Sequence, residues 1–168
     1  MSNKTNIALI GMPGAGKSTV GVLLAKLVGL GFVDTDLEIQ QREGASLQAI
    51  LEAQGYKVLR DIEAAVLAPV LLPGRVIATG GSAVYDSASM QRLAVAGPIV
   101  YLQADLETVQ ARVKLQPLRG IASPQGQSLK DVFLERTRLY ERYADVIVAV
   151  RSHSPQQLAE EIVAALAL

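Results

Sequence analysis

The sequence of 168 residues contains no cysteine and no tryptophan, only 4% of its residues are aromatic, and its one histidine is His153. Without cysteine the chain can form no disulfide framework, no thiolate nucleophile and no thiolate metal site. His153 stands in the polar segment RSHSP, with neither a nucleophile nor metal-ligand spacing around it. We therefore expect His153 on the surface, outside any catalytic site.

Long apolar runs and an excess of charge of either sign are also missing. Lys+Arg and Asp+Glu number 16 each, which argues against a broad surface for nucleic acid or anionic membranes. The apolar run near the start, residues 7–10, is too short for a signal peptide or a membrane span. We expect a cytoplasmic monomer without nucleic-acid or membrane partners.

Half of the residues are hydrophobic, and they fall in short runs that alternate with segments of helical periodicity. This order is typical of an α/β domain with a parallel sheet, and the length suits one domain, residues 1–168. We expect strands at 7–10, 32–34, 76–79, 99–102 and 146–150. We expect helices at 17–28, 36–43, 47–54, 57–71, 87–96, from 106, at 128–143 and from 155. Residues suited to N-caps precede four of these helices: Asp86, Asp105, Ser128 and Ser154.

The clearest motif is GMPGAGKST, residues 11–19, which fits the phosphate-loop pattern G-x-x-x-x-G-K-[ST] between an expected strand and an expected helix. Small residues let consecutive backbone N–H groups surround a phosphate, and the helix N-terminus adds positive potential. Lys17 would reach the terminal phosphates and Ser18 would ligate Mg²⁺. The expected nucleotide-binding residues are Gly14, Ala15, Gly16, Lys17, Ser18 and Thr19. A glycine-rich turn without a nucleotide is the alternative.

Two carboxylates, Asp34 and Asp36, end the second expected strand in FVDTDLE. In an extended strand they share one side, and ligands of open α/β sheets bind beyond the carboxyl ends of the strands. Phosphoryl transfer needs carboxylates for Mg²⁺ and for the attacking hydroxyl, so a nearby phosphate loop favours a catalytic role. The alternative is that Asp36 only caps the following helix, with Glu38 in its first turn.

Two arginines, Arg60 and Arg136, are candidates for a functional role, and each has a structural alternative. Arg60 precedes Glu63 by three residues, which is the spacing of an ion pair on a helix surface. Arg136 lies in an apolar stripe of the helix expected at 128–143. An arginine there either extends its charge to solvent or faces an acidic ligand in a cleft.

Two segments without helical or strand periodicity also invite a functional interpretation. Gly80 and Gly81, in VIATGGSAVYD, follow the third expected strand, where paired glycines indicate a tight turn or the close approach of a ligand. Residues 116–128 are rich in Gly, Pro, Ser and Gln. Such a segment is either a loose surface loop or a functional lid.

Nearly end to end, these segments resemble the shikimate kinase family. FVDTD is similar to the family's Asp-x-Asp segment, and LRDIE is similar to its Phe-Arg-x-x-Glu segment. TGGS is similar to its Gly-Gly-Gly turn, and RTRLY is similar to its Arg-x-Pro-Leu-Tyr segment. QPLRG lies where the family has a lid with Arg-Pro-Leu. The resemblance implies the fold of nucleoside monophosphate kinases. That fold is a P-loop three-layer α/β/α architecture with a five-stranded parallel sheet in the order 2-3-1-4-5, with a lid here at about 116–128 and acceptor-binding helices at about 36–62.

The activity implied by the resemblance is transfer of the ATP γ-phosphate to the 3-hydroxyl of shikimate, with Mg²⁺, in the chorismate pathway to the aromatic amino acids. Lys17 and Asp36 would be catalytic, with Asp36 orienting or deprotonating the hydroxyl. Ser18 and Asp34 would serve the metal, Asp34 through water. The remaining implied contacts are Arg60 and Arg136 to the shikimate carboxylate, backbone at Gly80 and Gly81 to the ring hydroxyls, and Arg112 and Gln116 near the nucleotide.

Five positions depart from the family pattern: Tyr56, Leu59, Ser82, Gln116 and Arg138. Gln116 replaces the lid arginine, and a neutral amide cannot stabilise developing phosphate charge as a guanidinium does, although Arg119 is a candidate substitute. Ser82 replaces the third glycine, so it is strained if its φ is positive and otherwise offers a hydroxyl to the acceptor. Two alternatives therefore accompany shikimate phosphorylation: a kinase of a related hydroxy acid, sugar acid or nucleotide, and a nucleotide-binding module with weak kinase activity.

Overall fold

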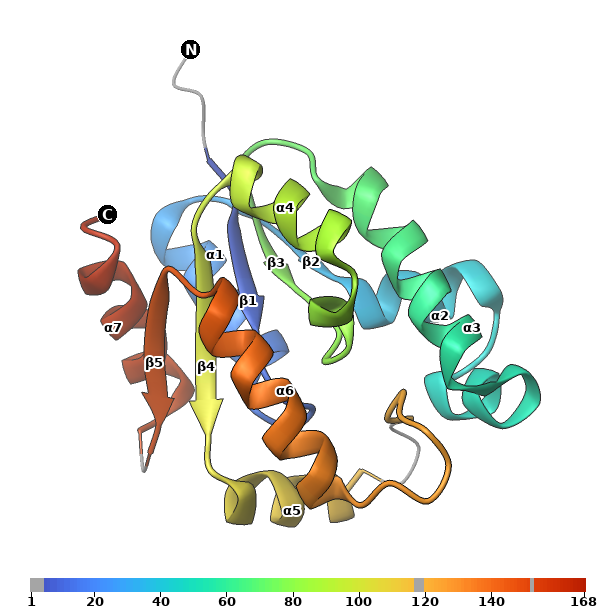
Figure 1. Cartoon of the computed structure of the whole chain (residues 1–168). Coiled ribbons are helices and arrows are strands. Elements are labelled where there is room, and N and C mark those ends of the chain that lie inside the picture. Colours follow the sequence, from blue (N-terminus) through green and yellow to red (C-terminus); the bar gives the residue numbers. More distant parts are fainter. Residues whose placement is uncertain (1–4, 117–119, 152) are drawn as a thin grey trace.

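The computed structural model describes residues 5–116, 120–151 and 153–168, and within them five parallel strands form one sheet in the order β2-β3-β1-β4-β5 (Figure 1). The strands are β1 (Ile7–Ile10), β2 (Gly31–Asp34), β3 (Arg75–Ala78), β4 (Ile99–Ala104) and β5 (Val146–Val150). The helices are α1 (Lys17–Val28), α2 (Thr35–Glu43), α3 (Leu47–Val70), the 3₁₀ turn η1 (Ala83–Tyr85), α4 (Ser87–Ala96), α5 (Leu106–Lys114), α6 (Leu129–Tyr143) and α7 (Pro155–Ala165). The α/β prediction and the predicted strand order are confirmed.

Helices cover both faces of the sheet. α1 and α7 pack together on one face, whereas α4 and α6 lie over the other (Figure 1). Strands with both faces covered are apolar along their whole length, which explains the unbroken run IALI of β1 and its complete burial. The carboxyl ends of β1, β2 and β3 meet at one edge, where the loops carrying the candidate site begin.

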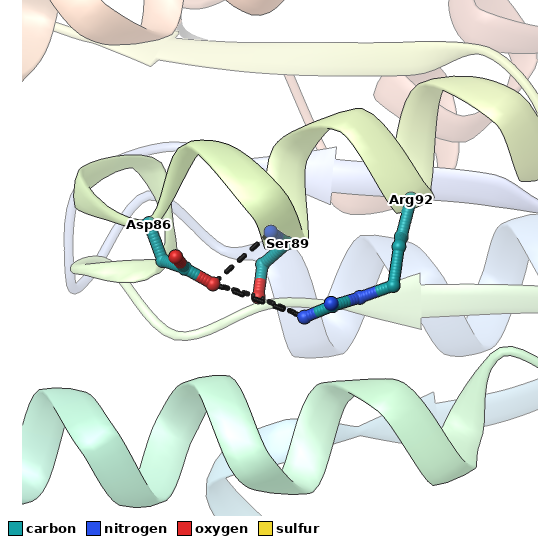
Figure 2. Close-up of polar contacts among 3 residues, drawn as sticks. All are labelled: Asp86, Ser89 and Arg92. Carbon is teal, nitrogen blue, oxygen red and sulfur yellow. Dashed lines mark hydrogen bonds and ion pairs between the residues drawn. The ribbon is translucent and has the colours of Figure 1, made fainter.

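The four N-caps expected from the sequence are confirmed. The side chains of Asp86, Asp105, Ser128 and Ser154 each accept a hydrogen bond from the backbone N–H three residues on. Asp86 also accepts from the Ser89 hydroxyl at 2.5 Å and lies 3.8 Å from Arg92, so a small polar cluster fixes the start of α4 (Figure 2). These caps satisfy backbone donors that the helices cannot satisfy internally.

Some element boundaries differ from the expectations by one or two residues, and one short element was not expected. The 3₁₀ turn η1 was not predicted, because three residues are too few to show a helical period. β4 extends two residues beyond the expected end. Helical structure continues across Leu47–Val70, but Gly55 within it has φ 84° and ψ 168°, so the expected break between two helices is present. Within the described residues no helix combines the length and the apolar character needed to cross a membrane.

Candidate active site

The phosphate loop lies between β1 and α1, as the motif predicts. Lys17 is only 3% exposed, and its Nζ donates to the carbonyl oxygens of Gly11 at 2.7 Å and Met12 at 2.9 Å. Gly11, Gly14 and Gly16 have positive φ values, so only glycine forms this loop without strain. The loop therefore holds a buried ammonium at the N-terminus of a helix, which is where anions bind.

Beside the phosphate loop is a cavity of about 360 Å³. It is lined by Gly14, Gly16, Lys17, Ser18, Thr19, Arg112, Leu115, Gln116 and Pro155. Arg112 reaches it from α5 and donates through Nη1 to the Gly14 carbonyl at 2.9 Å, so it supports the phosphate loop from outside. The structure thus brings together most of the residues expected around a nucleotide, including Gln116 of the expected lid, whereas Arg119 lies outside the described residues.

Asp34 and Asp36 belong to different elements, because β2 ends at Asp34 and Asp36 lies in α2. The strand ends at Asp34, which is buried and caps α2 by accepting from the Asp36 N–H at 2.9 Å. The alternative that Asp36 caps this helix is therefore wrong, because Asp36 already lies in the first turn. Asp34 pairs with Ala78 across the sheet, so two residues further on Asp36 comes to lie beside Gly80.

Neither Gly80 nor Gly81 has a positive φ, so the backbone conformation does not require glycine at these positions. Glycine is required because neighbouring side chains leave no space for a Cβ. A Cβ at Gly80 would stand 1.8 Å from Glu63 Oε1 and 3.0 Å from Asp36 Oδ1. A Cβ at Gly81 would stand 2.9 Å from Arg136 Nη1. Any larger residue would displace these charged side chains, so the glycine pair leaves space in which they converge.

Arg60 of α3 and Arg136 of α6 donate to the same oxygen, the carbonyl of Ala122. Arg60 Nη2 lies 3.0 Å and Arg136 Nη2 lies 2.8 Å from it. Arg60 also stacks on Tyr85, with Cζ 3.7 Å from the ring centroid. Arg136 is 1% exposed, so it does not extend to solvent, and it lines a cavity; that this cavity holds an acidic ligand stays a prediction.

Glu63 does not form the surface ion pair with Arg60 that the spacing allowed. The structure contains no ion pair between Arg60 and Glu63, although both are described; Glu63 is 5% exposed and accepts from the hydroxyl of Ser82. Burial raises the pKa of Glu63 to about 7, against the hydrogen bond from Ser82, and Asp36 adds to the rise. A sequence signal existed, because Glu63 follows the buried Leu59 by four residues and so shares its helix face.

These groups surround a second, smaller cavity of about 20 Å³. It is lined by Pro13, Asp36, Ile39, Leu47, Leu59, Glu63, Gly80, Gly81, Ser82, Gly120, Ala122 and Arg136. Two polar atoms on these side chains are buried without a hydrogen-bond partner among the described residues: Glu63 Oε1, an acceptor, and Arg136 Nε, a donor. Buried polar atoms without partners are costly, so these two atoms favour a bound polar group, from water or a ligand, in this cavity.

The departures from the family pattern fall around this cavity in different ways. Leu59 and Ser82 line it, whereas Tyr56 lies under Arg60, with Arg60 Cζ 5.0 Å from its ring centroid. Arg138 is exposed. His153 is exposed as expected, 3.9 Å from Glu161.

Comparison with known proteins identifies the chain. The shikimate kinase family model matches residues 13–167. The chain belongs to the shikimate kinase family. It is 41% identical over 161 residues to a shikimate kinase of Pseudomonas aeruginosa, covering 94% of this chain and 93% of that protein. It is 36% identical to shikimate kinase 1 of Yersinia enterocolitica, covering 97% and 96%.

Solved structures of shikimate kinases share the architecture. A shikimate kinase from Acinetobacter baumannii in complex with shikimate superposes with a TM-score of 0.90 at 32% identity, covering 98% of this chain and 93% of that one. The enzyme from Aquifex aeolicus gives a TM-score of 0.82 at 31% identity, covering 96% of each chain. The shikimate kinase fold, with its phosphate loop, is therefore established for this chain, which is a kinase of an ATP-dependent family that generally uses a divalent metal.

Proposed function

We propose that this kinase transfers the γ-phosphate of ATP to the 3-hydroxyl of shikimate, and that its two cavities bind the two substrates. ATP would occupy the larger cavity beside Lys17, and shikimate the smaller one between Asp36 and Arg136. The observation that carries the assignment is the smaller cavity's pair of orphaned atoms. A ligand that satisfies Arg136 Nε and Glu63 Oε1 together needs an acceptor group and a donor group, which a hydroxylated carboxylic acid supplies.

Arg60 and Arg136 would bind the shikimate carboxylate. Arg60, through Nε and Nη2, and Arg136, through Nη2, already donate to a single oxygen, the Ala122 carbonyl, and a carboxylate would offer a charged oxygen in its place. A cavity of about 20 Å³ admits little more than one water molecule, so a six-membered ring enters only if the segment carrying Gly120 and Ala122 moves outward. Acceptor binding would thus exchange the Ala122 contact for the carboxylate contact.

Asp36 would accept the hydrogen bond, and then the proton, of the attacking 3-hydroxyl. Its carboxylate lies over Gly80 at the edge of the acceptor cavity, near the phosphate loop. In the transfer, the hydroxyl oxygen forms a bond to the γ-phosphorus, the bond to the β–γ bridging oxygen breaks, and ADP leaves. Lys17 would stabilise the charge that develops on the phosphates.

The glycine turn would contribute one backbone donor to the acceptor. The Gly80 N–H donates to Thr35 Oγ1 at 2.9 Å, the Gly80 carbonyl accepts from Ala83, and the Gly81 carbonyl accepts from Tyr140 at 2.6 Å. Three of the four backbone groups therefore have partners within the protein. A ring hydroxyl would accept from the remaining one, the Gly81 N–H.

Ser18 and Asp34 would hold Mg²⁺. Ser18 lines the nucleotide cavity and Asp34 is buried at the end of β2. No group of three or more His, Cys, Asp or Glu side chains suited to a metal occurs in the described part of the chain. A site with one or two protein oxygens fits Mg²⁺, which takes its other ligands from water and substrate phosphates and would here neutralise phosphate charge.

An acceptor panel with Mg-ATP tests this function. We expect ADP release with shikimate, a loss of about a hundredfold or more in kcat/KM with its methyl ester, which lacks the carboxylate charge, and little with gluconate or a nucleoside monophosphate. Equal rates with shikimate and its methyl ester would contradict the arginine site. A faster reaction with gluconate or the nucleotide would contradict shikimate as the acceptor.

The lid at 116–128, the cytoplasmic location and the monomeric state stay predictions. Sedimentation with and without substrates would measure the oligomeric state.

A further inference from the structure

Arg60 is held in place by contacts of two kinds. Its Nε and Nη2 donate to the carbonyl oxygen of Ala122. Its guanidinium also lies against two aromatic rings, with Cζ 3.7 Å from the ring centroid of Tyr85 and 5.0 Å from that of Tyr56. A bound carboxylate would replace the Ala122 contact. Among the contacts of the described residues, the aromatic ones are therefore those that can hold Arg60 both without and with the acceptor.

Packing alone does not fix Arg60, because a third cavity, of about 280 Å³, lies beside it between α3 and the segment of η1 and α4. Arg60 and Tyr85 both line this cavity, and so does Asp86 of the polar cluster at the start of α4 (Figure 2). Arginine has a long, flexible side chain, and a carboxylate across open space is an attractive partner for it. Within the described part of the chain Arg60 forms no ion pair, so the contact with Tyr85 opposes a turn of Arg60 toward this cavity.

Tyr85 is itself fixed by a third element. It ends η1, just after the glycine turn, and its hydroxyl donates to Oε1 of Glu135 in α6 at 2.5 Å. Oε2 of Glu135 accepts from Gln127 at 3.1 Å, which fixes the carboxylate in turn. Burial raises the pKa of Tyr85, and the bond to Glu135 adds to the rise, so the hydroxyl keeps its proton and remains a donor at neutral pH. The ring therefore has a defined position before the acceptor binds.

The aromatic contacts of Arg60 come from residues that the family motifs do not specify. The family segment Phe-Arg-x-x-Glu has an aromatic residue directly before the arginine, where this chain has Leu59. Tyr56 also departs from the family pattern, and Tyr85 lies outside the segments that carry the resemblance. The support of Arg60 is thus a feature that this structure shows and the motifs do not predict.

We propose that Tyr85 is a positioning residue for the acceptor: its ring, anchored through Glu135, holds the Arg60 guanidinium toward the acceptor carboxylate. This inference rests on the proposed function and deepens it. The face of an aromatic ring attracts a cation without using its N–H donors, so all of these stay available to a carboxylate. A carboxylate partner for Arg60 would instead compete with the substrate. Tyr85 therefore adds selectivity for an acid over its uncharged ester.

Steady-state kinetics of Tyr85→Leu test the assignment. Loss of a cation–π contact at a half-buried ring corresponds to a rise of about fivefold in the KM for shikimate, with kcat and the KM for ATP nearly unchanged. Tyr85→Phe keeps the ring and loses only the hydroxyl, so its KM should stay within about twofold of the wild-type value.

A second pair of arginine and tyrosine supplies the matched control. Arg142 Cζ lies 5.7 Å from the ring centroid of Tyr143, and neither is among the described residues that line the nucleotide and acceptor cavities. Tyr143→Leu should therefore leave the KM for shikimate unchanged. A rise as large in Tyr143→Leu as in Tyr85→Leu would overturn the assignment, because it would show a general effect of losing a ring.

Two further comparisons separate positioning from packing. With shikimate methyl ester, which lacks the carboxylate charge, Tyr85→Leu and wild type should have nearly equal kcat/KM. In an Arg60→Gln background, Tyr85→Leu should have little effect on the KM for shikimate, because the ring then has no guanidinium to hold. Tyr85→Met fills a similar volume without a ring and gives the same comparisons if Tyr85→Leu does not fold.

Three results would overturn the assignment: an unchanged KM for shikimate in the variant without the ring, an equal loss with the acid and the ester, or an equal loss in both backgrounds. A wild type that does not phosphorylate shikimate at all would instead overturn the proposed function.

Discussion

Replacing Glu63 by glutamine should remove a pH-dependent cost to the stability of the fold. The pKa of Glu63 rises from 4.5 to about 7 in the folded protein, chiefly because the group is buried. Between these two values the folded state retains a proton that the unfolded state has released. The free energy of unfolding of the wild type therefore falls as pH rises through this range, and the cost is fully present above about pH 7.

The size of this cost follows from the two pKa values. At 1.36 kcal/mol per pH unit, a rise from 4.5 to about 7 amounts to about 3 kcal/mol. Glutamine has nearly the same shape as glutamate and carries no charge. The substitution also changes hydrogen bonds, but their contribution to the free energy of unfolding does not depend on pH. We therefore expect the stability difference, Glu63→Gln minus wild type, to increase by about 3 kcal/mol between pH 4 and pH 8.

Urea unfolding at a series of pH values measures this difference, because the contributions of titrating groups that do not interact with Glu63 cancel between the two proteins. Glu52→Gln is the matched control, since Glu52 is an exposed carboxyl group on the same helix. A change with pH as large in Glu52→Gln as in Glu63→Gln would mean that burial of Glu63 is not the cause. A constant difference for Glu63→Gln would refute the reasoning, because it would mean that Glu63 titrates alike in the folded and unfolded states.

Three substitutions test the other proposed roles by steady-state kinetics. Lys17→Ala should lower kcat by about 10³-fold or more, because a buried cation of the phosphate loop is lost, and a modest loss would contradict its role. Arg136→Ala should raise the KM for shikimate on the order of a hundredfold and leave the KM for ATP within about twofold. A large loss of ATP binding would mean that Arg136 contacts ATP and not the acceptor. Gln116→Arg should raise kcat by about tenfold or more, since Gln116 lines the nucleotide cavity and an added guanidinium would stabilise phosphate charge. An unchanged kcat in this variant would contradict a limiting role of position 116.

Much of the fold could be predicted from the sequence because its signals are local. The apolar run of β1, the caps at Asp86 and Ser128, and the phosphate loop each depend on residues that are neighbours in the chain. The strand order could not be derived in this way, and it came from the family resemblance. The start of α2 was misplaced because Asp34 and Asp36 are both good caps, and only the end of the strand decides between them.

The sequence indicated many of the residues that line the two cavities, but few of the contacts between them. The charges of Arg60 and Arg136 pointed to an acidic ligand, but their convergence on the Ala122 carbonyl joins three distant segments and leaves no local pattern. A surface pair with Arg60 was one interpretation of Glu63 because their spacing is visible in the sequence, whereas its partner Ser82 is 19 residues away. Contacts between elements depend on tertiary packing, which a single sequence does not display.

Identification of the phosphorylated product tests the central claim most directly. Purified protein would be incubated with Mg-ATP and shikimate, and the product examined by mass spectrometry and phosphorus NMR. The account predicts one phosphate monoester, on the 3-hydroxyl of shikimate, formed in equal amount to ADP and absent in Lys17→Ala. ADP release that does not depend on shikimate, or a phosphate on another hydroxyl, would contradict it.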